Sequence, residues 1–189
     1  AARILGPEGS VAKILNNYSR ISYNFGPTLL SWLERKDSRT YGAILEADQE
    51  GRRLYGGHGP ALAQAHGHII LPLAHQDDKL TQIVWGLEDF RRRFGRNPEG
   101  LWFPEAAVDS ESLDLAAQEG VRFTILSPAQ ASGPVETTRP YSVNLPSGRK
   151  IAVFFYDGPI SSAVAFENLL SSGEKFLAKI KEASSLAGV

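Results

Sequence analysis

Two patterns of apolar and polar positions alternate along the 189 residues. Short apolar runs of the kind that form strands are followed by longer stretches in which apolar side chains recur every three or four residues. This spacing predicts a helix that begins at Pro27, further helices near residues 38–54, 77–94 and 110–120, and a helical tail from Ser161 onward. The intervening strands are expected to end near residues 25, 65, 103, 126 and 155.

Strands that alternate with helices usually pair in parallel through right-handed crossovers, so the pattern predicts an α/β domain with helices outside the sheet. Residues 141–157 read as two strands joined by a turn around Pro146-Ser147-Gly148. A chain of this length can bury about 70% of its unfolded surface, so we expect residues 1–189 to form one domain.

Composition narrows the possible partners. Lys and Arg (20) nearly balance Asp and Glu (21) and are scattered, which argues against nucleic acid or a membrane surface. The exception is the run Arg91–Arg93, which we interpret as a solvated helix face. No apolar stretch approaches the 18 or so residues of a membrane span, and no secretory signal pattern begins the chain.

The chain contains no cysteine and no methionine. Without cysteine it has no disulfide framework, thiolate metal site or thiol nucleophile, and its composition agrees with a cytoplasmic location. Without even an initiator methionine, we expect that the chain begins inside a longer protein or has been processed.

Polar side chains follow several of the expected strands. Because binding residues of α/β domains cluster where parallel strands end, we expect these side chains to converge. They are Asn24, His66, His68, Glu105, Ser127 and Asp157. His66 and His68 alternate, so on an extended chain they face the same way, as metal ligands would.

Five blocks of the sequence, in this order, resemble glycoside hydrolase family 57, and most closely its large bacterial branch. The blocks are NNYSRISYNFGPTLLSWLE, GGHGPALAQAHGHIILPLA, PEGLWFPEAAVD, GVRFTILSPAQA and FFYDGPISSAVAFE. The resemblance implies a distorted seven-stranded (β/α) barrel that acts on α-glucans with retention of configuration. Members of the family include amylases, branching enzymes and glucan transferases.

The resemblance also implies roles for individual residues. Glu105 of WFPEAAVD corresponds to the catalytic nucleophile, and Trp102 in the same block lies beside the sugar site. His68 of HIILP is placed in the binding cleft, with His66 next to it, and Tyr156 and Asp157 of YDGPIS are possible substrate-binding residues. Neither a metal nor another cofactor is expected.

A retaining glycosidase needs two carboxyl groups about 5–5.5 Å apart, one to attack the anomeric carbon and one to protonate the leaving oxygen. Glu105 beside Trp102 and Phe103 has suitable surroundings for the first role. The family's general acid, an Asp in a DGE-type motif on the last strand, and the His-rich block on its first strand are both missing. We therefore expect five of the seven barrel strands here, the general acid downstream of Val189, and little or no activity in this chain alone.

Two other functions stay open. Polysaccharide deacetylases have a related barrel and hold a metal with an Asp and two His, although their usual His-x3-His spacing is absent here. Alternatively, the chain is a carbohydrate-binding module without catalysis. The sequence leaves open which glucan is used, whether hydrolysis or transfer prevails, and the oligomeric state.

Each candidate residue also has a plainer interpretation. Glu105 could be an exposed loop residue and Trp102 simple core. Asn24 and Ser127 could cap helices or close turns. For His58 and His75 a structural role is the preferred reading.

Overall fold

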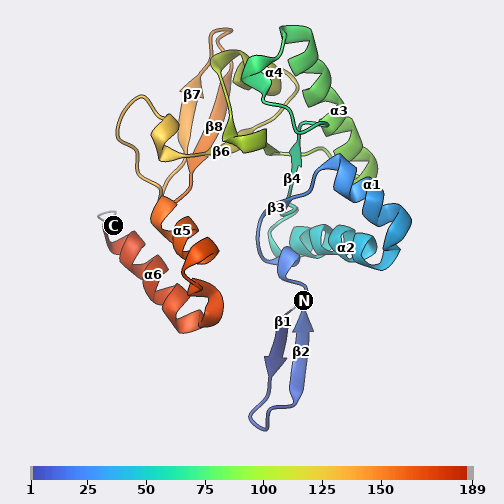
Figure 1. The fold of residues 1–189 in the computed structure, drawn as a ribbon, viewed down its shortest axis with the longest axis vertical. Helices are drawn as coiled ribbons and strands as arrows, with labels where there is room; N and C mark the ends of the chain where they lie inside the picture. Colours follow the sequence, from blue (N-terminus) through green and yellow to red (C-terminus); the bar gives the residue numbers. More distant parts are fainter. Residues whose placement is uncertain (1, 187–189) are drawn as a thin grey trace.

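The computed structural model describes residues 2–186 of the chain. Its strands are β1 (Ala2–Leu5), β2 (Val11–Leu15), β3 (Tyr23–Asn24), β4 (Ala61–Gln64), β5 (Leu101–Trp102), β6 (Phe123–Leu126), β7 (Tyr141–Asn144) and β8 (Lys150–Phe155). Its helices are α1 (Pro27–Lys36), α2 (Ser38–Leu54), α3 (Gln76–Phe94), α4 (Ser110–Gln118), α5 (Gly158–Phe166) and α6 (Gly173–Leu186). Figure 1 shows how these elements are arranged.

The main strands form two three-stranded sheets. Strands β3, β4 and β5 pair in parallel in that order, and β6 pairs in parallel with β8, which also pairs antiparallel with β7. A single parallel bridge between Gly100 and Phe123 joins the two sheets. The α/β class with parallel strands is thus confirmed, as is the hairpin at residues 141–155, whereas a barrel is not established by these strands.

An N-terminal hairpin was missing from the sequence prediction. Strands β1 and β2 pair antiparallel and extend away from the rest of the molecule (Figure 1). Their side chains are mostly exposed, including the apolar Ile4, Leu5, Val11 and Ile14. Neither strand therefore shows the burial on one face that usually reveals a strand in a sequence.

The core lies between the sheets and the helices that cover them. Buried apolar side chains of α3, such as Ile83 and Leu87, belong to one core cluster with buried strand residues such as Leu101. The most deeply buried side chains are Leu71, Ile83, Leu87, Leu101, Phe103, Ile151 and Val153. This burial accounts for the three-and-four spacing of apolar residues in α3 and for the short apolar runs read as strands.

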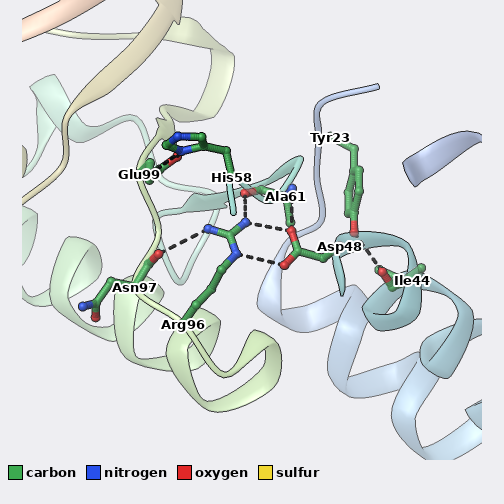
Figure 2. A network of polar contacts seen from close by, with 8 residues as sticks. All are labelled: Tyr23, Ile44, Asp48, His58, Ala61, Arg96, Asn97 and Glu99. Carbon is green, nitrogen blue, oxygen red and sulfur yellow. Dashed lines mark hydrogen bonds and ion pairs between the residues drawn. The ribbon is translucent and has the colours of Figure 1, made fainter. Parts of the chain in front are cut away.

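A buried ion pair ties the helices to the amino end of β4 (Figure 2). Asp48 of α2 is 1% exposed and accepts two hydrogen bonds from the Arg96 guanidinium, at 2.7 and 2.9 Å. The amide of Ala61 also donates to Asp48, and Arg96 donates to the carbonyl of Ala61. A buried carboxylate needs such partners, so this network fixes where β4 begins.

The Asp48–Arg96 network leaves no room for a side chain at Gly59. Tyr23 lies beside the same network (Figure 2). A Cβ at Gly59 would lie 2.3 Å from the Asp48 carboxylate. The Tyr23 hydroxyl donates to the carbonyl of Ile44, and burial, with the charge of Asp48, raises the pKa of Tyr23 well above its ordinary value. His58 lies nearby with its Nδ1 2.9 Å from Glu99 (Figure 2).

The interpretation of Arg91–Arg93 as a solvated face is wrong for Arg93. Its side chain is 1% exposed and donates to Asp89 and Glu34, and also to the hydroxyl of Tyr41. Burial works against the charged form, but these hydrogen bonds prevail and raise the pKa of Arg93. Arg93 therefore joins α3 to α1 through Glu34 and to α2 through Tyr41.

Candidate active site

The turn that follows β5 has an unusual backbone. Glu105 and Ala106 both adopt left-handed conformations, with φ of 54° and 51°. For residues other than glycine, such a conformation costs about 1–2 kcal/mol each. Backbone strain of this kind persists only where surrounding structure imposes it, and it is concentrated at functional sites.

Buried neighbours impose this turn. Phe103 is fully buried, and Pro104 after it is also buried, so both anchor the chain before the turn. The side chain of Glu105 is 70% exposed. The apolar residues thus hold a carboxylate at the surface just beyond the carboxyl end of β5.

A second anchor comes from the loop after β6. Gln130 donates from its amide nitrogen to the carbonyl of Ala106 and accepts from the amide of Ser127 at 2.8 Å. Ser127 in turn accepts from the amide of Ala129, which completes a capping box. The structure therefore gives Ser127 the capping role that was the plainer of its two readings.

Helix α3 anchors the segment that follows this turn. Lys79 is 3% exposed, and its ammonium donates to Asp109 at 2.7 Å and to Glu111 at 2.6 Å. Burial alone would lower the pKa of Lys79, but these hydrogen bonds prevail and raise it. Burial would raise the pKa of Asp109, but its bonds with Lys79 and Ser112 lower it. Asp109 is also the N-cap of α4, which begins at Ser110.

His68 meets Glu105 across the strand ends. Its Nε2 lies 3.0 Å from Oε1 of Glu105, although the two residues are 37 positions apart in sequence. The Nε2–H therefore donates to the carboxylate. Two side chains expected to converge thus do so.

Helix α3 holds the segment that carries His68. The amide of His66 donates to the backbone carbonyl of Gln82 at 2.9 Å, and the amide of Gly67 donates to the side-chain oxygen of Gln82 at 2.6 Å. A Cβ at Gly86 would lie 2.0 Å from the carbonyl oxygen of Gln64, so only glycine lets α3 approach this closely. His66 also makes an edge-on ring contact with Trp85.

A groove of about 570 Å³ adjoins His68 at the ends of β3 and β4. Its lining includes Asn24, Leu29, Trp32, Gln64, His66 and His68. Asn24 donates from its amide nitrogen to Oε1 of Gln64 at 2.6 Å. The groove therefore combines an aromatic wall with an amide floor and two imidazoles.

The remaining candidates lie in different surroundings. Trp102 is half-buried in β5, and Tyr156 is 38% exposed just after β8. Asp157 caps α5, since its Oδ1 accepts from the amide of Ile160 at 2.7 Å, and it lines a separate hollow with residues of α6. His75 occupies the cap position of α3 without a side-chain capping bond.

Sequence reasoning missed the groove residues Trp32 and Gln64. A signal for Trp32 was available, because Leu30 and Leu33 form the buried face of α1 and leave Trp32 on the other side. For Asp157 the capping role was also readable, because an Asp followed by Gly-Pro is typical of a helix start. Gln64 had no such signal, since its environment depends on how β3 and β4 align.

Two further observations concern the described part of the chain. Across residues 2–186, no three or more His, Asp or Glu side chains gather as a metal site would require. In the same residues, every helix is too short or too polar to cross a membrane.

Solved structures with the same fold include two α-glucan enzymes. The 4-alpha-glucanotransferase from Thermococcus litoralis matches with a TM-score of 0.63 and 20% identity, over 79% of this chain and 23% of its own length. The exo-type maltose-forming amylase from Pyrococcus sp. ST04 matches with a TM-score of 0.65 and 20% identity, over 78% of this chain and 24% of its own. The chain thus spans about a quarter of these relatives.

Comparison by sequence gives the family. A search of curated proteins found no significant match. The family model described as Glycosyl hydrolase family 57, however, matches residues 16–188, which is nearly the whole chain. The chain therefore belongs to glycosyl hydrolase family 57, as its sequence blocks indicated.

Proposed function

We propose that this chain forms the central part of the catalytic domain of a retaining enzyme that acts on α-glucans by hydrolysis or glycosyl transfer. Strands β3, β4, β5, β6 and β8 would then be five strands of a seven-stranded barrel. The family and the two solved relatives, a glucanotransferase and an amylase, support this proposal.

One observation carries the role of Glu105. Its carboxylate is presented by a strained turn and accepts a hydrogen bond from His68, which comes from a different strand end. A reactive carboxylate must be held in one orientation. Buried Phe103 and Pro104 and the hydrogen bond from Gln130 to Ala106 hold this turn, while Lys79 holds the segment that follows it. An ordinary exposed loop glutamate would have no need of this arrangement.

The chemistry follows from that geometry. Glu105 attacks the anomeric carbon of a bound glucose unit, and a second carboxyl group protonates the oxygen that leaves. Water or a sugar hydroxyl then releases the glycosyl group from Glu105. We propose that the second group is an Asp outside residues 1–189, contributed by the rest of the natural polypeptide.

The test is Glu105→Gln in the natural polypeptide that carries this chain. Gln keeps the shape of the side chain and can still pair with His68, but it cannot act as a nucleophile. Cleavage of α-glucan should fall about 10³-fold or more. The matched control is Glu119→Gln at the end of α4, which should leave the rate unchanged. If the Glu105→Gln protein cleaves α-glucan as fast as the Glu119→Gln protein, Glu105 is not the nucleophile.

A further inference from the structure

The groove beside His68 has unpaired amide groups in its floor. Gln64 is only 7% exposed, and its single hydrogen bond to Asn24 uses one amide nitrogen and one amide oxygen. Within the described residues this leaves one amide oxygen and one amide nitrogen of the pair without a partner, whichever way each amide is turned. Among the described residues, the buried side-chain nitrogen and oxygen atoms without a partner include only Ser112 Oγ, so these two amide atoms are accessible to solvent and can bind a hydroxyl group of a ligand.

The wall of the groove is aromatic. Trp32 is 52% exposed although it is large and apolar, and Leu29 beside it is 44% exposed. Among the described residues that line the groove there is no Asp, Glu, Lys or Arg. A neutral ligand with one apolar face and several hydroxyl groups fits such a lining, because the ring of Trp can stack on that face while the amides bind hydroxyls.

The groove is also continuous with Glu105 through one side chain. His68 lines the groove and at the same time donates to the Glu105 carboxylate. A ligand in the groove would therefore lie next to the sugar that Glu105 attacks.

We propose that this groove is a binding subsite for a further glucose unit of the α-glucan, with Trp32 as its stacking platform and Asn24 and Gln64 as its hydroxyl-binding floor. The inference rests on the proposed function for the identity of the sugar, but it assigns residues that the catalytic role of Glu105 does not require. It also predicts that long substrates bind better than short ones through Trp32.

The experiment measures binding in the absence of turnover. The natural polypeptide with Glu105→Gln is titrated with maltohexaose by calorimetry, alone and combined with Trp32→Ala, Trp32→Phe or Phe166→Ala. Trp32→Ala should raise the Kd about tenfold, equivalent to about 1.4 kcal/mol. Trp32→Phe, which keeps a ring face, should have a smaller effect. Phe166→Ala, the matched control, removes an aromatic side chain that is 86% exposed on α5 and should have none. Cellohexaose tests whether the groove selects the α-linkage.

Two results would overturn the subsite. One is an unchanged Kd in the Trp32→Ala protein, with circular dichroism confirming that it is folded. The other is an equal loss in the Phe166→Ala control. Because Trp32 is half exposed, its replacement by Phe also provides a variant whose folding is not in question. A failure of the proposed function would show separately, as undiminished α-glucan cleavage by the Glu105→Gln protein.

Discussion

Glu105 illustrates what a sequence motif can and cannot predict. The PEGLWFPEAAVD block identified the carboxylate, and the buried Phe103 before it explains why it stays at one place. The left-handed backbone of Glu105 and Ala106 was not predictable, because neither residue type favours that conformation. A contact that is distant in sequence, from Gln130 in the loop after β6, holds this turn at Ala106.

The same limit applies to its neighbours. His68 was expected near Glu105, but their 3.0 Å contact required the register of β4 against β5. Asp157 was expected to bind substrate, and that role stays a prediction, since its observed contact is the cap of α5. Short-range capping was readable from local sequence, whereas long-range contacts depend on the assembled sheet.

The ion pair of Asp109 gives a prediction for acid stability. Its folded pKa is lowered, so its contribution to folding is complete above its unfolded value and is lost as the pH falls through the lower folded value. In Asp109→Asn, the free energy of unfolding should therefore fall less steeply than in the wild type below about pH 4. Urea titrations at pH 7, 4, 3 and 2.5 measure this, and parallel curves would contradict the assignment.

Lys79 sets the opposite, alkaline limit of the same pair. Its folded pKa is raised, so its contribution is complete below its unfolded value and is lost only as the pH rises through the higher folded value. Both groups are therefore charged in the neutral range, where the ion pair between α3 and the start of α4 is at full strength.

Helix α3 is the element that organises the site. It supplies Lys79 to Asp109 at the start of α4, Gln82 to the segment of His66 and His68, and Gly86 to the contact with β4. Its position was predicted almost fully, as 77–94 against an observed Gln76–Phe94, because its apolar spacing and its terminal Gly95 are both strong local signals. Its contacts could not be predicted in this way.

Gly86→Ala tests the contact between α3 and β4. The added methyl group would collide with the Gln64 carbonyl, so the free energy of unfolding should fall by about 1–3 kcal/mol. Gly42→Ala in α2 is the matched control, since nothing lies within 4 Å of the added group. That change should stabilise the protein by about 0.5–1 kcal/mol, because glycine is unfavourable inside a helix. Urea unfolding measures both, and a loss of stability in both variants alike would contradict the packing argument.

Across the whole molecule, the two ends of the parallel strands differ in character. The amino end of β4 holds the buried Asp48–Arg96 network, whose groups are satisfied by one another (Figure 2). The carboxyl ends carry the strained turn, exposed imidazoles and the groove with its unpaired amides. The contacts that stabilise the fold thus lie at the end of the strands opposite the candidate active site, as is usual for parallel α/β domains.

Strand and helix periods are local properties, so this arrangement of elements could largely be predicted from the sequence. All five expected strands are present, at β3, β4, β5, β6 and β8, but β3 and β5 are only two residues long. The N-terminal hairpin was missed because it buries little. The chain spans about a quarter of the length of its two solved relatives. The complete seven-stranded barrel therefore belongs to the proposed function.

The nucleophilic role of Glu105 is tested most directly by chemical rescue. In the natural polypeptide carrying Glu105→Ala, an α-glucosyl substrate with a good leaving group is offered together with azide. Azide fills the space of the missing carboxylate and attacks from its side, so the account predicts a β-glucosyl azide, identified by NMR. An α-glucosyl azide would instead assign Glu105 to acid–base catalysis. Undiminished hydrolysis without an azide product would leave it no catalytic role.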